Sequence, residues 1–240
     1  MTIVSCLFGR GGSKSLPGKN TMLVHGKRLM EYPILACKQA GVDRLFCSTD
    51  DEVITNTAKN HGVEIIPRPD ELCTDAALLQ DAISHAYHEC KAKVGSIKYF
   101  VITMCNAANI TGDAIKEAIS KLDANPQYDS VITVARYEMF APERARTPDN
   151  AGELQPYISF DKFDHEITCD RKSHNPTMFA DGGVTVVRGE CLEDISKNKL
   201  PFQWMGNNIS YLEQLPSTGD IDMAWQVPVI EWWLKENGVA

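Results

Sequence analysis

The chain lacks any run of apolar residues approaching the roughly 18–20 that a helix needs to cross a bilayer. Its first apolar stretch, residues 2–8, is too short for the core of a signal peptide and follows no basic leader. The eight cysteines include no Cys-x-x-Cys pair, which disfavours a zinc cage or a thioredoxin-like site and suggests reduced, buried thiols. We therefore expect a cytoplasmic protein that does not associate with membranes.

Acidic residues are missing from the first thirty positions, although they outnumber basic residues in the whole chain. This head has a local charge of +5, and because the formal net charge is −8, the rest of the chain carries −13. A net negative protein is a poor general binder of nucleic acid, so we predict no nucleic-acid partner. A basic, glycine-rich head favours a local anion site over the alternative, a solvated basic loop.

Short β-prone runs alternate with helical patterns of ten to fifteen residues in the first part of the chain. The alternation predicts one α/β domain over 1–240, with a mostly parallel sheet covered by helices on both faces. A break at about 136–175, rich in proline, charge and aromatics, predicts an inserted arm. The predicted strands are 2–8, 44–47, 63–66, 99–104, 130–135, 181–188 and 208–211, and the predicted helices are 29–40, 51–60, 76–91, 111–122 and 224–237. Asp75 is the expected N-cap of the third helix.

The glycine-rich loop after the first predicted strand reads Arg-Gly-Gly-Ser-Lys-Ser-Leu-Pro-Gly-Lys-Asn over residues 10–20. It is not a dinucleotide fingerprint, because Lys14 stands where the third glycine is required. It is not a P-loop either, because five residues separate its last two glycines and no Ser or Thr follows the second lysine. Three cations on such a loop can surround a triphosphate at the carboxyl end of a parallel sheet, where these folds bind ligands.

This loop resembles the opening signature of the acylneuraminate cytidylyltransferases, which include CMP-sialic acid synthetase and relatives acting on other nonulosonic acids. Further segments resemble the family in order and spacing: residues 47–50, 58–64, 68–75, the Asp-Gly-Gly turn at 181–183, and Asp-Ile-Asp at 220–222. The resemblance covers most of the chain. It implies a three-layer α/β/α Rossmann-like nucleotidyltransferase fold with an inserted dimerisation arm. It also implies a homodimer that uses Mg²⁺ and transfers CMP from CTP to a sugar acid, releasing pyrophosphate.

The resemblance further implies roles for individual residues. The catalytic set would be Arg10, Lys14, Lys19 and Asp222, with Lys19 at the α-phosphate and Asp222 able to draw the acceptor proton. The nucleotide would meet Leu7, Gly9, Arg10, Gly11, Gly12, Ser13, Lys19, Asn20 and Arg68. The acceptor would meet Met104, Asn106, Asn109, Arg171 and Asp181. Mg²⁺ would be held by Asp220 and Asp222, which alternate on an extended backbone and can face the same side.

Plainer interpretations stay open for three of these residues. Asp222 precedes a predicted helix and could be only its N-cap. Arg68 could be a surface ion-pair partner, and Arg171 could belong to a solvated charged loop.

The segment after the fourth predicted strand departs from the family pattern. Where the sialic acid enzymes typically carry Gln-Pro-Thr-Ser-Pro-Leu-Arg, this chain has Met-Cys-Asn-Ala-Ala-Asn-Ile over 104–110. In the family this segment helps to form the acceptor wall, so we expect Asn106 and Asn109 to offer neutral amides to an unusual acceptor. We predict a small anion other than ordinary N-acetylneuraminate: another nonulosonic acid, a ketodeoxy sugar acid, or a phosphonate.

Two other functions are compatible with the residues. One is a sugar-phosphate nucleotidyltransferase that uses a different base. The other is a nucleotide-binding regulator that has lost its chemistry, although the presence of both Asp220 and Asp222 disfavours it.

Overall fold

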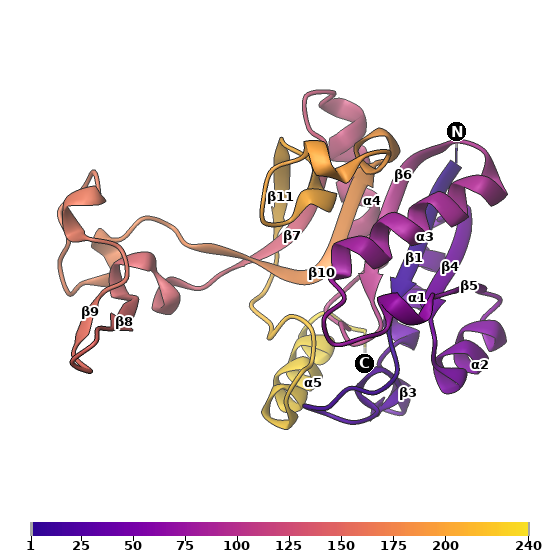
Figure 1. The fold of residues 1–240 in the computed structure, drawn as a ribbon, viewed down its shortest axis with the longest axis horizontal. Helices are drawn as coiled ribbons and strands as arrows, with labels where there is room; N and C mark the ends of the chain where they lie inside the picture. The colour runs from indigo at the N-terminus through magenta and orange to yellow at the C-terminus, as the bar shows by residue number, and fades with distance from the viewer. Residues whose placement is uncertain (1, 240) are drawn as a thin grey trace.

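The centre of the computed structural model, which describes residues 2–239, is a seven-stranded sheet in the order β11-β7-β10-β6-β1-β4-β5. Figure 1 shows this sheet crossing the body of the molecule. The strands are β1 (Thr2–Phe8), β4 (Arg44–Thr49), β5 (Glu64–Pro67), β6 (Ile97–Met104), β7 (Ser130–Arg136), β10 (Met178–Arg188) and β11 (Ile209–Glu213). Short hairpins are formed by β2 (Leu23–Val24) with β3 (Lys27–Arg28) and by β8 (Arg146–Pro148) with β9 (Leu154–Pro156).

Only β10 runs against its neighbours among the strands of this sheet, being antiparallel to both β6 and β7. The other neighbouring pairs are parallel, so the prediction of a mostly parallel sheet is confirmed. The pairing of β10 with β7 breaks between Ala180 and Thr185. A break of this kind bends a strand and re-aims its side chains, here at the Asp-Gly-Gly turn.

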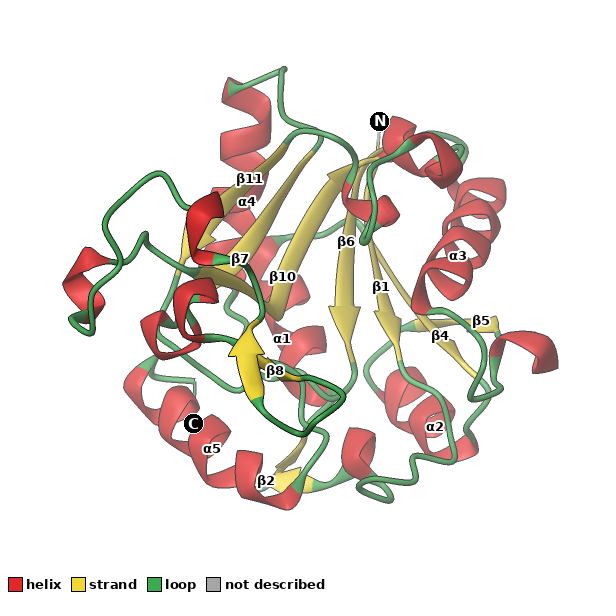
Figure 2. Ribbon diagram, turned by 60° about the vertical axis from the view of Figure 1, so that its left-hand side comes forward, coloured by secondary structure: helices red, strands yellow, loops and turns green. Residues whose placement is uncertain are grey.

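Helices cover both faces of the sheet, as Figure 2 shows. Alternate residues of β6 point to opposite faces: Phe100 and Ile102 pack in one core cluster with α3, whereas Tyr99 and Val101 pack in another with α1 and α4. This alternation is the reason for the three layers, because a strand buried on both sides must bury its odd and even side chains separately. The helices are α1 (Glu31–Ala40), α2 (Glu52–Asn60), α3 (Leu79–Val94), α4 (Gly112–Ala124) and α5 (Val227–Glu236).

The start of α3 differs from the prediction. The N-cap is Leu78, and the helix begins at Leu79. The expectation that Asp75 caps this helix is wrong, because its carboxylate is engaged by two cations of the glycine-rich loop instead. The local sequence favoured Asp75 as a cap, but in the folded chain its carboxylate forms ion pairs with residues distant in sequence.

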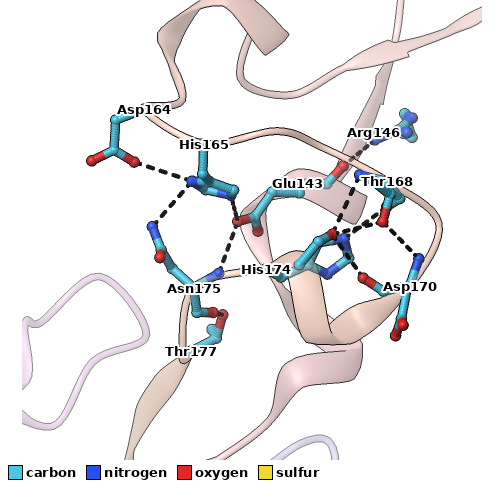
Figure 3. Close-up of polar contacts among 10 residues, drawn as sticks. Glu143, Arg146, Asp164, His165, Thr168, Asp170, His174, Asn175 and Thr177 are labelled. Carbon is cyan, nitrogen blue, oxygen red and sulfur yellow. Dashed lines mark hydrogen bonds and ion pairs between the residues drawn. The ribbon is translucent and has the colours of Figure 1, made fainter.

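Residues 137–177 leave the sheet after β7 and return at β10, and Figure 1 shows them projecting to the left of the body. Few apolar side chains are buried in this arm, and a polar network takes their place (Figure 3). Glu143 is 3% exposed and lies 3.0 Å from His165 Nε2, whose other ring nitrogen is 3.1 Å from Asp164. The backbone N–H of Asn175 also donates to Glu143, so the network ties the two ends of the arm together.

No helix within residues 2–239 combines the length and the apolar composition that crossing a membrane requires.

Candidate active site

A cavity of about 460 Å³ opens at the carboxyl ends of β1 and β6. Phe8 and Gly9 contribute the end of β1, and Met104 and Asn106 contribute the end of β6. The glycine-rich loop, the segment before α3, and the Asp-Ile-Asp segment complete the wall. Figure 2 shows the arrowheads of β1, β4 and β6 at this same edge, which is where parallel α/β sheets bind ligands.

The glycines of the loop allow its turns, and Asn20 closes it. A Cβ atom on Gly9 would lie 2.7 Å from Cys105 Sγ, so only glycine fits where the loop leaves β1. Gly12 and Gly18 both have φ of +71°, a region that glycine adopts without strain. Asn20 is buried and donates from Nδ2 to the carbonyl of Arg10 at 3.0 Å, which closes the loop on itself.

Lys19 lies at the inner end of this loop and forms an ion pair with Asp222. The two residues are 203 positions apart in sequence, so the basic head and the late acidic motif share one cavity. The Lys19 side chain is 16% exposed, whereas that of Asp222 is 49% exposed. Lys19 is therefore the most sheltered of the three loop cations and the least screened by water.

Arg10 and Lys14 both bind Asp75, at 2.9 Å and 2.5 Å. The hydrogen bonds from Lys14 and then Arg10 hold the pKa of Asp75 below its usual value. Arg10 also donates to the carbonyl of Cys73 at 2.8 Å, which fixes its guanidinium against the segment before α3. Each of the three loop cations thus forms an ion pair with a carboxylate. Asp75 is therefore a site residue, whereas its sequence context predicted a helix cap and the resemblance placed it at the end of segment 68–75 without giving it a role.

Asp220 and Asp222 line the cavity from either side of Ile221, which is fully buried. The interpretation of Asp222 as a helix cap is wrong, because Met223 takes the N-cap position of the turn before α5. The backbone N–H groups of Asp222 and Met223 instead donate to Gln226 Oε1, each at 2.7 Å.

Two carboxylates facing a cavity are hard oxygen donors of the kind that Mg²⁺ prefers. Across residues 2–239, no group of three or more His, Cys, Asp or Glu side chains is arranged to hold a metal ion. A cation at Asp220 and Asp222 would therefore complete its coordination with water or with substrate oxygens, as Mg²⁺ does in nucleotide sites.

Arg68 is 8% exposed and lines the cavity. Its Nε donates to Ser48 Oγ at 3.1 Å and its Nη2 to the Ser48 carbonyl at 2.8 Å. These bonds anchor Arg68 to the end of β4, so the surface ion-pair interpretation does not hold.

The remaining nucleotide-side residues divide into two groups. Ser13 joins Gly9, Arg10, Lys14, Lys19, Asn20 and Arg68 on the cavity wall. As far as residues 2–239 form that wall, it does not include Leu7, Gly11 or Gly12. Leu7 is fully buried within β1, and the Gly11 N–H donates to Asp50 beside a second hollow that Gly12 also lines.

Only some of the residues that were predicted to contact the acceptor line the cavity. Met104 and Asn106 lie on the cavity wall. Asn109 is fully buried, and its side-chain amide donates to the Asp181 backbone carbonyl at 2.8 Å. This amide therefore links residue 109 to β10 and does not face the cavity. Arg171 is exposed in a turn of the arm, which carries it away from the sheet (Figure 1).

Asp181 is a buried structural carboxylate. It accepts hydrogen bonds from Thr133 Oγ1 at 2.6 Å, from the Gly183 N–H at 3.0 Å, and from Gln214 Nε2 at 2.6 Å. Burial raises the pKa of Asp181 despite these three donors. Its carboxylate links β7, β10 and the residue after β11. The carboxylate of the Asp-Gly-Gly turn therefore has a structural role and does not line the main cavity.

A smaller chamber of about 220 Å³ adjoins the main cavity and shares Leu79, Met104 and Asp220 with it. The other lining residues are Ile102, Ile132, Thr133, Ala180, Gly182, Thr185, Phe202, Trp204 and Met205. Phe202 and Trp204 were not expected, because they belong to a segment of short turns with no helical or strand periodicity.

Comparison with known proteins finds a family described as Cytidylyltransferase, whose sequence profile matches residues 7–159. An N-acylneuraminate cytidylyltransferase of Escherichia coli is 27% identical over 135 residues, covering 56% of this chain and 31% of that protein. One of Streptococcus agalactiae is 35% identical over 193 residues, covering 79% of this chain and 44% of that protein. The chain thus matches less than half the length of these curated relatives.

A solved structure of CMP:2-keto-3-deoxy-manno-octonic acid synthetase complexed with CTP superposes with a TM-score of 0.68. It is 16% identical and covers 99% of this chain and 100% of that one. At this identity the likeness establishes the fold alone, a Rossmann-like α/β fold.

Proposed function

Because the chain belongs to the cytidylyltransferase family, we propose that it transfers CMP from CTP to a sugar acid and releases pyrophosphate. One observation carries the proposal: a single cavity holds Lys19 of the glycine-rich loop against Asp222 of the Asp-Ile-Asp segment. A triphosphate and its counter-charges need such a juxtaposition of cations and carboxylates. The nucleotide would enter between them and separate the pair.

In the reaction, a hydroxyl oxygen of the acceptor bonds to the α-phosphorus, and the bond from that phosphorus to the bridging oxygen of pyrophosphate breaks. Negative charge grows on the α-phosphate oxygens and on the leaving pyrophosphate. Lys19, whose side chain is mostly buried, would stabilise the charge on the α-phosphate oxygens. Arg10 and Lys14 would stabilise the charge on the leaving pyrophosphate. The hydroxyl proton would pass to Asp222, which is half exposed within the same cavity.

Mg²⁺ is part of this proposal, with Asp220 and Asp222 as its protein ligands. When bound, the ion would neutralise part of the triphosphate charge. The chain's contribution is to bring both carboxylates into the cavity that the loop cations also line.

We assign the smaller chamber to the acceptor. Its walls are mainly apolar, and none of the described residues that line it is Lys or Arg. A purely polyhydroxylated group would lose hydration there without gaining ionic partners, whereas an apolar substituent would be stabilised. Among the acceptors other than ordinary N-acetylneuraminate, this favours another nonulosonic acid that carries apolar substituents. It disfavours a ketodeoxy sugar acid, which is polyhydroxylated, and a smaller anion such as a phosphonate, which would find no cation on these walls.

A panel experiment tests both halves of the proposal. The protein is incubated with Mg²⁺, one nucleoside triphosphate and one acceptor acid, and pyrophosphate release is measured. We expect turnover with CTP and not with ATP, GTP, UTP or dTTP. Preference for another base with a sugar phosphate would replace cytidylyl transfer by the alternative activity. Best turnover with N-acetylneuraminate itself would defeat the acceptor hypothesis. CTP binding that is unchanged in Asp222→Asn, with no pyrophosphate release from any acceptor, would favour the regulator.

The arm supports a homodimer as part of the proposal. Leu154 and Tyr157 are 70% and 69% exposed at its far end. At its root, a hollow of about 580 Å³ is lined by Phe140, Phe179 and Trp232 among others. Apolar surface of this kind is typical of contacts between subunits. Sedimentation should give a dimer that dissociates when Leu154 and Tyr157 are both changed to Asp, and an unchanged mass would refute the role of the arm. A cytoplasmic location, where CTP is available, completes the proposal.

A further inference from the structure

The segment that departs from the family pattern, residues 104–110, is bonded to the segment that carries the two cavity carboxylates. Asn106 and Ile221 exchange hydrogen bonds: the Ile221 N–H donates to the Asn106 carbonyl at 2.9 Å, and Asn106 Nδ2 donates to the Ile221 carbonyl at 3.0 Å. Asn106 Nδ2 also lies 3.4 Å from Asp220 Oδ2. One side chain therefore contacts both the peptide between the carboxylates and one of the carboxylates.

Residue type matters at this position. A primary amide has two N–H donors on one nitrogen, so Asn106 can serve a carbonyl and a carboxylate together. An apolar side chain of the same volume can serve neither. Asn106 is 6% exposed, so water cannot easily replace a lost donor.

The Ile221 peptide sets the direction of its neighbours. Its side chain is fully buried in a core cluster with Leu29, Tyr32 and Trp233. Asp220 and Asp222, on either side of Ile221 in the chain, both line the cavity, so the position of the Ile221 peptide decides where the two carboxylates lie. The bonds to Asn106 and the packing of the side chain keep that peptide in place.

Gln226 provides a second set of hydrogen bonds to this segment. Its Oε1 accepts from the backbone N–H groups of Asp222 and Met223, and its side-chain amide donates to the Asp220 carbonyl at 3.3 Å. Asn106 and Gln226 thus hold the Asp-Ile-Asp segment from its two sides, and only Asn106 reaches a carboxylate oxygen.

We propose that Asn106 is a positioning residue for the divalent cation, acting through Asp220 and Asp222, and not a contact for the acceptor. This inference rests on the proposed function, since it assumes that these carboxylates bind a cation together with CTP. It explains the departure of this segment as a device for holding the carboxylates. Partners that orient metal ligands typically change metal affinity by about 10–100-fold when they are removed.

The test measures the binding of Mn²⁺ to the protein in the presence of CTP, and electron paramagnetic resonance detects the bound ion. Two variants remove the amide: Asn106→Leu keeps the branched shape and the number of side-chain heavy atoms, and Asn106→Ala truncates the side chain. Asn198→Ala is the matched control, because Asn198 also donates to two backbone carbonyls, those of Cys191 and Gln203, at 2.8 Å each, but it does not line the cavity. Circular dichroism and thermal unfolding establish that each variant is folded.

Both Asn106 variants should raise the Kd for Mn²⁺ by about tenfold or more, while Asn198→Ala leaves it within about twofold of the unmodified protein. In pyrophosphate assays the Mg²⁺ concentration for half-maximal rate should rise likewise, with the KM for the acceptor unchanged. An unchanged Kd for Mn²⁺ in a folded Asn106 variant overturns the inference, and so does an equal rise in Asn198→Ala. A raised KM for the acceptor with unaltered Mn²⁺ binding would restore Asn106 to the acceptor wall.

Failure of the proposed function has a different signature. If the unmodified protein binds Mn²⁺ no better with CTP than without it, or if Asp222→Asn binds Mn²⁺ as well as the unmodified protein does, the cation site itself is refuted. If those two controls succeed and only the Asn106 variants bind normally, the function stands and the positioning role falls.

Discussion

Replacing Lys19 by Met should slow the chemical step far more than it weakens the binding of CTP. The change keeps the length of the side chain and removes its charge. In the free protein Lys19 is paired with Asp222, whose side chain is 49% exposed and can be hydrated when the lysine is lost. The free energy of unfolding should therefore change by no more than about 1 kcal/mol, the usual range for an ion pair with an exposed partner.

The effect on the reaction follows from the shelter of the ammonium group. Two unit charges about 4 Å apart interact by about 4 kcal/mol at an effective dielectric constant of about 20. The Lys19 side chain is 16% exposed, so screening by water reduces this only in part. Loss of one preorganised donor to a developing anion costs about 2–4 kcal/mol. That range corresponds to a fall in kcat of roughly 30- to 900-fold.

The assay is pyrophosphate release at saturating CTP, Mg²⁺ and acceptor. Lys14→Met is the matched control, because the Lys14 side chain is 83% exposed. We expect it to lower kcat less than about tenfold, since exposed charges are strongly screened. If Lys19→Met raises only the KM for CTP, the lysine binds substrate and transition state equally and the reasoning is refuted. Equal losses of kcat in the two variants would also refute it.

Three further predictions concern the same site. Asp75→Asn should lower the Kd for CTP by roughly twofold to fivefold in a calorimetric titration, because it frees two exposed cations; weaker binding would show that Asp75 orients them. The pKa of Asp75 is lowered by these cations, so the stability that their ion pairs contribute is present above the unfolded pKa and is lost as the pH falls through the folded one. Asp181→Ala should destabilise the fold by about 3 kcal/mol in urea unfolding, because three buried donors lose their acceptor. Burial raises the pKa of Asp181, so the stability of the unmodified protein relative to this variant should shrink as the pH rises through that pKa, and a difference that grows would contradict the assignment. Gly9→Ala places a Cβ atom 2.7 Å from Cys105 Sγ and should cost about 1–3 kcal/mol of stability, whereas an unchanged melting temperature would mean that the loop yields.

The elements were predictable wherever local pattern and tertiary environment agree. The apolar run at residues 2–8 forms the interior strand β1, and the glycines after it form the loop. The alternation of strands and helices survives with boundaries shifted by a few residues, because periodicity marks the buried face of an element better than its ends. The antiparallel direction of β10 was not predicted, because nothing in a strand's own sequence states which neighbours it will pair with.

Site residues were harder to predict than elements. Asn109 and Asp181 were expected to face an acceptor, yet both side chains are bonded inside the protein: Asn109 to the backbone carbonyl of residue 181, and the Asp181 carboxylate to three donors of the sheet and the segment after it. A buried polar side chain and a ligand-binding one have the same residue type, and only the surroundings distinguish them. Asp75 had a good local reason to cap a helix, and its cationic partners lie 61 and 65 positions away.

By itself the order of residues determined the chemistry that was available: a cationic glycine loop after a buried strand, two late carboxylates on alternate positions, and the rhythm of a layered α/β domain. These depend on neighbours in sequence, because backbone freedom, charge and periodicity are local properties. Only the tertiary structure decided which groups meet. It pairs Lys19 with Asp222, and Arg10 and Lys14 with Asp75. It also buries Asn109 and places Arg171 in the projecting arm. The reason is that hydrogen bonds and ion pairs form between positions brought together by burial of the sheet's two faces, and that burial is a property of the whole chain.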